Sequence, residues 1–175
     1  VDLSEADYGV ALLNNGKYGH GFYGGHLTLS LVRSGTHPDE AADRCEHRFT
    51  YSLRPHRGAF SVREVVWPAH ELNAPMRTMP TARRTGSAEA VSWFACDRES
   101  VILETVKQSD DGRALVLRVY QAEACRGRAQ VTAFRPVRSV AECTMLEQPV
   151  RVLPVRGRAW RFELGPFEIK TFRVV

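Results

Sequence analysis

The chain has 175 residues, of which 43% are hydrophobic and 25% charged, as expected for one or two soluble globular domains. No window approaches about 18 uninterrupted apolar residues, so we expect no membrane contact, and the acidic start VDLSEADYG does not resemble a signal peptide. The net charge of +4 comes from scattered basic residues without a cluster, so nucleic acid is not an expected partner.

The first part of the chain, residues 1–62, holds alternating patterns typical of half-buried strands. Two clear strands are predicted, over residues 26–32 and 47–53, and each places its apolar side chains on a single face. We expect these faces to be buried. The residues concerned are Leu27, Leu29, Leu31, Phe49, Tyr51 and Leu53.

Residues 63–99 contain Pro68, Pro75 and Pro80 and the polar stretch TARRTGSAEA, which are typical of loops. This segment is predicted to be a long connection with one strand over Val91–Cys96. No long amphipathic helix with caps at both ends is expected anywhere in the chain.

Residues 100–175 show short alternating runs about 10–15 residues apart, separated by turn signals such as Gly165-Pro166. Trp160 alternates with Phe162 and Leu164 and is therefore expected in the core. The predicted fold class is all-β, an antiparallel β-sandwich. The predicted strands are Val101–Val106, Ala114–Tyr120, Ala129–Phe134, Ala159–Leu164 and Phe167–Val174.

The four cysteines, Cys45, Cys96, Cys125 and Cys143, lie far apart and form no C-x-x-C pair, so a zinc ribbon or a thioredoxin motif is not supported. Two disulfides in a secreted protein remain an alternative. We favour unpaired cysteines that act as small buried hydrophobes in a reducing cytosol, hence a cytoplasmic protein.

Histidines offer two candidate metal sites. His37 and Asp39 have the spacing of two ligands on one face of a strand, but Pro38 between them fits a loop better. His26, His47 and His56 could meet across a sheet and bind zinc, whereas a hydrogen-bonded histidine on a half-buried strand is the commoner arrangement. No metal site is assigned.

A catalytic centre within the chain is not predicted. The sequence contains neither G-x-S-x-G nor a phosphate-binding G-x-x-x-x-G-K-[ST] motif. Glu40, Asp43 and Glu46 could form a carboxylate pair for glycoside hydrolysis, but they occupy a polar stretch in which solvated carboxylates are expected. No catalytic residue is therefore assigned.

Four stretches, taken together, resemble one family. They are YGVALLNNGKYGHGFYGGHLTLSLVRSGTHPDEAADRCEHRFTYSLRPHRGAF, HELNAPMR, LVLRVYQAEACRGRAQV and GPFEIKTFRV. In their order and residue pattern, these stretches resemble the C-terminal β-region of the glycoside hydrolase family 38 α-mannosidases of the cytosolic and bacterial type. The resemblance extends over essentially the whole chain.

The resemblance implies a retaining, zinc-dependent exo-glycosidase whose nucleophile, acid/base and zinc ion lie in an N-terminal barrel outside this chain. Residues 1–62 would then be the closing strands of a large β-sandwich and residues 100–175 a small terminal β-sandwich. No cofactor is expected in this chain, and zinc is expected in the parent enzyme. The expected partners are the remainder of the α-mannosidase chain and a mannose-containing oligosaccharide, and a homo-oligomer is left open.

The family presents an arginine from the large sandwich to its sugar-binding region, and the segment LSLVRS matches that place. The resemblance therefore makes Arg33 a candidate substrate-binding residue, with Lys17 and Tyr18 in the preceding glycine-framed loop as weaker candidates. Asn15-Gly16 stands where relatives are expected to have Asp-Cys. A solvent-exposed arginine at a strand end is the competing interpretation of Arg33.

Two other function classes remain open. A free-standing, lectin-like sandwich would bind sugars on exposed aromatic side chains, for which Trp67, Trp93, Tyr18, Tyr23 and Tyr120 are available. A structural interaction sandwich would instead show a large apolar patch without affinity for sugars.

Overall fold

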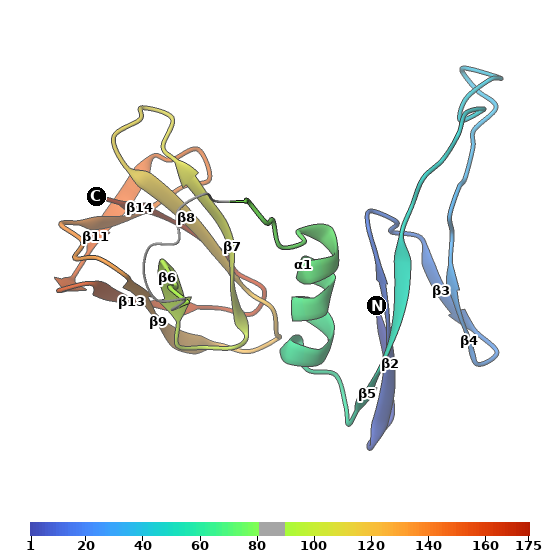
Figure 1. Cartoon of the computed structure of the whole chain (residues 1–175), viewed down its shortest axis with the longest axis horizontal. Coiled ribbons are helices and arrows are strands. Elements are labelled where there is room, and N and C mark those ends of the chain that lie inside the picture. Colours follow the sequence, from blue (N-terminus) through green and yellow to red (C-terminus); the bar gives the residue numbers. More distant parts are fainter. Residues whose placement is uncertain (81–89) are drawn as a thin grey trace. The chain divides into compact units, whose positions relative to one another are not determined.

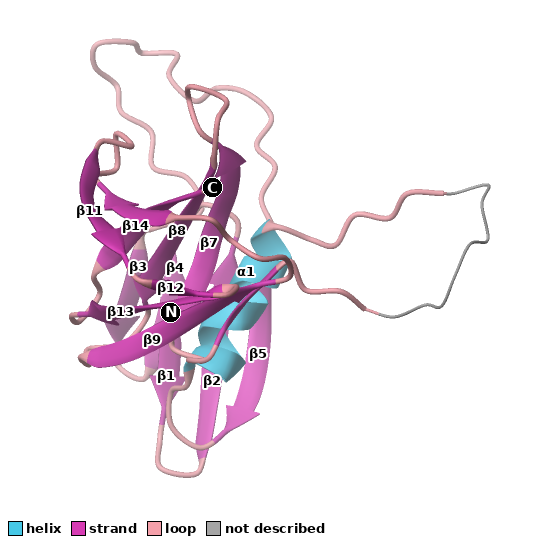
Figure 2. Ribbon diagram, turned by 90° about the vertical axis from the view of Figure 1, so that its left-hand side faces the viewer, coloured by secondary structure: helices cyan, strands magenta, loops and turns pink. Residues whose placement is uncertain are grey.

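The computed structural model describes residues 1–80 and 90–175, which form two compact units, Val1–Pro80 and Thr81–Val175 (Figure 1). Most of the regular structure is antiparallel strand, with one short helical segment (Figure 2). The predicted all-β class is therefore confirmed. No helix in the described ranges is long and apolar enough to cross a membrane.

The first unit contains a three-stranded antiparallel sheet in the order β1-β2-β5. Its strands are β1 (Asp2–Ser4), β2 (Tyr8–Asn14) and β5 (Tyr51–Arg57). One turn of π-helix, η1 (Val62–Val66), leads directly into the α-helix α1 (Trp67–Asn73). The helical segment packs on β2.

The core of the first unit lies between β2 and the helical segment. Ala11, Leu13 and Val65 are buried there, and Ala69 and Leu72 pack against them. Val65, Ala69 and Leu72 follow each other at the spacing of four and three that places side chains on one face of a helix. The helix differs from the loop predicted here from the prolines, because Pro68 stands in the first turn, where a missing N–H is harmless.

The expected burial of Tyr51 and Leu53 is wrong for this chain, because their side chains are 56% and 66% exposed. The strand also begins at Tyr51 and runs to Arg57, later than predicted. Leu53 pairs with Leu12 of β2, and these two residues lie on the face opposite the helix. Alternation correctly grouped the side chains, but the helix covers the other face of the sheet.

A two-stranded hairpin completes the first unit. It consists of β3 (His20–Tyr23) and β4 (His26–Leu29), joined by Gly24 and Gly25. Both glycines have positive φ, 58° and 79°, as a tight two-residue hairpin turn requires. The predicted strand over residues 26–32 is therefore present, but it ends at Leu29.

The second unit is a sandwich of two antiparallel sheets, ordered β11-β10-β14-β8-β7 and β12-β13-β9-β6. Strands β7, β8, β9, β13 and β14 correspond to the five predicted ones, and β6 to part of the predicted Val91–Cys96. The bounds are β6 (Phe94–Cys96), β7 (Val101–Gln108), β8 (Leu115–Gln121), β9 (Gly127–Ala133), β10 (Val140–Cys143), β11 (Pro149–Leu153), β12 (Val155–Arg156), β13 (Ala159–Leu164) and β14 (Ile169–Val174).

Between these two sheets lies an apolar core that includes Trp160, confirming its predicted burial. The Trp160 and Phe172 rings meet edge to face with centroids 6.1 Å apart, and Phe162 lies 4.6 Å from Phe172. Aromatic pairs of this geometry add to the stabilisation from burial alone. The short strands β10 to β12 were not predicted, because two to five residues carry little periodic signal.

The predicted division into residues 1–62, 63–99 and 100–175 stays a prediction. In the structure, the helical segment that follows residue 61 belongs to the first unit, which extends to Pro80. The stretch TARRTGSAEA lies mostly outside the described residues.

Candidate functional site

A tight turn after β2 positions two of the candidate residues. The side-chain oxygen of Asn14, Oδ1, accepts hydrogen bonds from the backbone N–H groups of Gly16 (3.1 Å) and Lys17 (2.5 Å). Gly16 has φ of 111°, a conformation that side chains disfavour. Asparagine commonly folds its own turn in this way, and here the turn presents Lys17 and Tyr18.

Arg33 reaches the same place from the other end of the hairpin. The backbone N–H of Ser30 donates to the carbonyl of Gly19 over 2.7 Å, which continues the pairing of β3 and β4 beyond their ends. The chain then runs on to Arg33. The segments around Lys17 and Arg33 are therefore neighbours in space, although the two residues are 16 positions apart in the sequence.

The loop between β4 and β5 adds a carboxylate and an imidazole. Asp43 has φ of 59° and accepts a hydrogen bond from Ser34 Oγ on its Oδ2, over 3.2 Å. His47 Nε2 lies 2.8 Å from the backbone carbonyl of Asp43 and donates to it. These contacts hold Asp43 at Ser34, the residue that follows Arg33.

These segments line one hollow with a volume of about 540 Å³, within the range of small-molecule sites. Its charged groups are Lys17, Arg33 and Asp43, and His47 adds an imidazole. The residues that line it are Gly16, Lys17, Tyr18, Gly19, Ser30, Leu31, Val32, Arg33, Asp43 and His47. All three residues singled out from the sequence thus lie at one hollow, whose role in substrate binding stays a prediction.

Two further wall residues were not selected from the sequence. The sequence suggested Asp43 as a member of a carboxylate pair or, more simply, as a solvated carboxylate, and His47 as a possible zinc ligand or a strand residue, but neither as a neighbour of Arg33. Asp43 lies ten residues beyond Arg33 in a loop without periodicity, so only the folded loop brings the two together. The only signal in the sequence was that His47 lies four residues after Asp43, and this spacing does not say where the two side chains lie in the fold.

Donors dominate the hollow, because it has two cationic side chains and one carboxylate. The Nζ of Lys17 lies 5.1 Å from the centroid of the Phe49 ring, a cation–π contact that restrains the lysine. Tyr18 is 95% exposed, so its ring is available for stacking against a ligand. A guanidinium, an ammonium and a carboxylate near the exposed Tyr18 ring suit a polyhydroxylated ligand.

A buried acid–base pair stabilises the sheet away from this hollow. His56 Nε2 lies 2.7 Å from Asp2 Oδ1, and their side chains are 0% and 6% exposed. Ser4 Oγ donates to the other carboxylate oxygen of Asp2. Gly9 leaves room for the imidazole, since a Cβ there would lie 2.4 Å from His56 Cε1.

The pKa values of this pair move in opposite directions. The hydrogen bond to Asp2 raises the pKa of His56, against the opposing effect of burial. Burial by itself raises the pKa of Asp2, but hydrogen bonds from Ser4 and His56 outweigh it and leave that pKa below its ordinary value. Both shifts favour the ionised pair, so His56 serves the sheet rather than a metal.

No metal centre is found in the part of the chain that the structure describes. Within residues 1–80 and 90–175, no three His, Cys, Asp or Glu side chains come together in a way that could hold a metal ion. His37 and Asp39 lie exposed in the loop, where Asp39 Oδ1 accepts from the N–H of Ala41 over 2.8 Å. The proposed meeting of His26, His47 and His56 is likewise not found among these residues.

All four cysteines are unpaired in the structure. Cys143 is buried, as expected of a cysteine that acts as a small hydrophobe, and burial raises the pKa of its thiol. Cys45 is exposed, so that expectation is wrong for Cys45.

Family models match both units of the chain. Residues 100–172 match the model described as "Glycosyl hydrolases family 38 C-terminal beta sandwich domain". Residues 1–41 match "Glycosyl hydrolases family 38 C-terminal domain". The second match includes Lys17, Tyr18 and Arg33, whereas Asp43 and His47 lie beyond its end.

The chain is also similar over its whole length to several mannosidases. It is 37% identical over 182 residues to alpha-mannosidase 2C1 of Mus musculus and 34% identical over 184 residues to alpha-mannosidase G of Dictyostelium discoideum. In both cases, 100% of the chain aligns with only 17% of the relative, so the chain spans about a sixth of their length.

A solved structure has the same fold. The crystal structure of an alpha-mannosidase from Enterococcus faecalis V583 matches 98% of the chain, with a TM-score of 0.73 and 22% sequence identity. The match covers 20% of that protein.

Proposed function

The chain belongs to the glycosyl hydrolases of family 38, as part of their C-terminal β-region, and from this membership we propose that it is the non-catalytic portion of a retaining, zinc-dependent α-mannosidase. It would support the rest of the enzyme and form part of the substrate pocket wall. The observation that carries this proposal is the similarity of the whole chain to about a sixth of much longer mannosidases, together with its match to two C-terminal models of the family.

The open face of the first sheet supports the structural role. Leu3, Tyr8, Tyr51 and Leu53 are 42%, 53%, 56% and 66% exposed on the face opposite the helix. Such an apolar surface normally packs against another protein surface. In our proposal, preceding segments of the enzyme cover this face and complete the large sandwich.

The hollow at Arg33 supports the role as a pocket wall. A guanidinium donates several hydrogen bonds in one plane, and a carboxylate accepts hydrogen bonds. Arg33 and Asp43 line the same hollow, so together they can bind donor and acceptor positions of sugar hydroxyl groups. Tyr18 offers a ring against which the apolar face of a hexose can stack. We propose a mannose-containing oligosaccharide as the ligand.

Catalysis is assigned to the part of the enzyme outside this chain. Retaining hydrolysis needs two carboxyl groups about 5–5.5 Å apart, one acting as nucleophile and the other as acid and base. The described residues provide no metal centre, so the zinc ion that the family uses would also be held elsewhere. We propose a cytoplasmic location, consistent with the four unpaired cysteines.

A complementation experiment tests this function. We expect purified residues 1–175 to leave a chromogenic α-mannoside intact, and an enzyme truncated just before Val1 to be inactive or unstable. Adding the chain to the truncated enzyme should restore turnover. The matched control is Leu53→Asp, which places a charge on the open face and should prevent restoration. Hydrolysis by the chain alone would overturn the proposal, as would equal restoration by the control.

Titration with mannose distinguishes two functions of the chain: a free-standing module that binds sugars by itself, and one wall of a substrate pocket in a larger enzyme. A wall needs the rest of the enzyme to complete the site, so the isolated chain should not bind mannose at millimolar concentrations. Saturable binding to the chain alone would favour the lectin-like alternative. Isothermal calorimetry is the suitable measurement, with galactose as the control sugar.

A further inference from the structure

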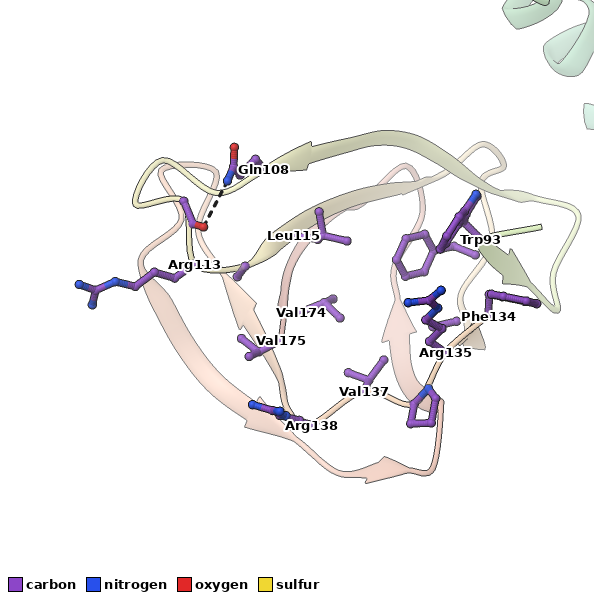
Figure 3. A pocket seen from close by; sticks show the side chains of 15 residues that line it. Trp93, Gln108, Arg113, Leu115, Phe134, Arg135, Val137, Arg138, Val174 and Val175 are labelled. Atoms are coloured by element: carbon purple, nitrogen blue, oxygen red, sulfur yellow. Dashed lines mark hydrogen bonds between the residues drawn. The ribbon is translucent and has the colours of Figure 1, made fainter. Parts of the chain in front are cut away.

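A second hollow lies within the terminal sandwich, and Figure 3 shows the side chains that line it. Its volume is about 620 Å³. Leu115, Val137 and Val174 occupy its middle. Leu115 of β8 pairs with Val174 of β14 in the five-stranded sheet, and Val137 comes from the loop between β9 and β10. Its size and apolar lining are those of small-molecule sites, which combine mostly hydrophobic walls with a few polar groups.

Exposed aromatic side chains form one wall. Trp93 is 61% exposed and Phe134 46% exposed, and their rings meet edge to face with centroids 5.6 Å apart. The backbone N–H of Phe134 donates to the carbonyl of Trp93 over 2.8 Å, so the two residues are fixed relative to each other. Large aromatic rings left exposed in such a fixed arrangement are typical of binding surfaces.

Basic groups accompany the aromatic wall. The guanidinium of Arg135 lies 5.9 Å from the centroid of the Trp93 ring, and Arg138 lines the opposite side of Val137. The side chain of Arg113 extends away from the hollow (Figure 3). None of the described lining residues has a carboxylate side chain. The terminal carboxylate of Val175 also lines the hollow, but the guanidinium groups of Arg135 and Arg138 leave an excess of positive charge there.

We propose that this hollow binds a small amphipathic anion, a carboxylate with an aryl or alkyl body. The apolar body would lie on Leu115, Val137 and Val174 beside the Trp93 ring. The carboxylate would accept hydrogen bonds from Arg135, and Arg138 would add positive charge on the other side of Val137. The apolar middle argues against a sugar, whose hydroxyl groups would find few partners there. This site does not depend on the function proposed for the first unit.

Binding of phenylbutyrate by the chain tests the proposal, with the neutral phenylbutyramide as its matched probe. A Trp67→Phe variant removes the exposed tryptophan of the first unit, so emission changes report on Trp93, because Trp160 is buried. We expect saturable binding of the acid, and at least about tenfold weaker binding of the amide, because charge-assisted hydrogen bonds contribute about 1.5–3 kcal/mol.

Variants locate the binding. Arg135→Gln with Arg138→Gln should remove the preference for the acid, whereas Arg156→Gln, at a separate depression of the same sandwich, should keep it. Equal binding of acid and amide, or a preference that survives the double change, would overturn the proposal. So would binding to the isolated chain that is lost in the longer enzyme, because protein would then cover the hollow.

Discussion

The two units bury their apolar residues in different ways. The second unit encloses its core between two sheets, and thirteen of its described residues form one buried cluster around Trp160 and Phe172. In the first unit, the corresponding cluster has three described residues, Ala11, Leu13 and Val65, on one face of a sheet. The other face presents Leu53 and its neighbours to solvent.

This difference distinguishes a sandwich whose core is enclosed between its own two sheets from a sheet with one apolar face left open. A buried large apolar side chain contributes about 1.5–3 kcal/mol relative to an exposed one. The terminal sandwich obtains this contribution within the chain, whereas the open face of the first sheet does not. The two proposed sites also lie on different units: the proposed pocket wall lies on the first unit, and the proposed anion site lies on the second.

The largest effect is expected in the closed core. Trp160→Ala should lower the free energy of unfolding of the second unit by about 3–5 kcal/mol, because the side chain is 1% exposed and leaves a cavity. Urea unfolding followed by circular dichroism measures it. A loss below about 1 kcal/mol would show that this core is loosely packed and would weaken the contrast between the units.

A substitution on the open face of the first sheet should have different effects on stability in the isolated chain and in the longer enzyme. Leu53→Ala should change the stability of the isolated chain by less than about 0.5 kcal/mol, as for a surface substitution. In the longer enzyme, it should cost about 2–5 kcal/mol, because the same side chain would then be buried. Equal small effects in both proteins would mean that nothing covers this face. Thermal unfolding of the matched pair provides the comparison.

Arg33 tests whether the first unit reaches the substrate. In the longer enzyme, Arg33→Ala should lower kcat/KM for an α-mannoside about tenfold, corresponding to a loss of about 1.4 kcal/mol of binding. Zinc content should stay unchanged, since no described residue of this chain forms a metal centre. Arg48→Ala is the control, because that side chain is exposed and pairs with Glu46. Unaltered kinetics would remove Arg33 from the site.

The smallest effect is a pH dependence confined to the first unit. The raised pKa of His56 contributes stability that is complete below its unfolded value of about 6.5 and is lost as pH rises through the folded pKa. The lowered pKa of Asp2 contributes stability above its unfolded value of about 3.9 and is lost as pH falls through the folded pKa. The pair therefore stabilises the sheet most between these two values.

Hydrogen exchange of amides in residues 1–80 measures this dependence. Protection of β2 and β5, corrected for intrinsic exchange, should be greatest near pH 5 and should decline on both sides. Asp2→Asn should flatten the profile while leaving the second unit unchanged. A profile that is equally steep in the variant would assign the dependence to other groups.

Much of the fold followed from the sequence. Period-two alternation predicted β7, β8, β9, β13 and β14 close to their observed positions, and placed Trp160 in the core. The resemblance to family 38, expected from four stretches of the sequence, is confirmed by both family models. Alternation is a local property, so it survives in any tertiary context that buries one face.

Tertiary structure alone decided which face is buried and which loops meet. Alternation groups Tyr51 with Leu53, but a helix following residue 61 covers the opposite face, and no local signal records that choice. Asp43 likewise joins Arg33 only because a loop without periodicity folds back on the hairpin. Which face is buried, and which loops come together, depends on contacts between residues far apart in the chain. Such contacts leave no local pattern in the sequence.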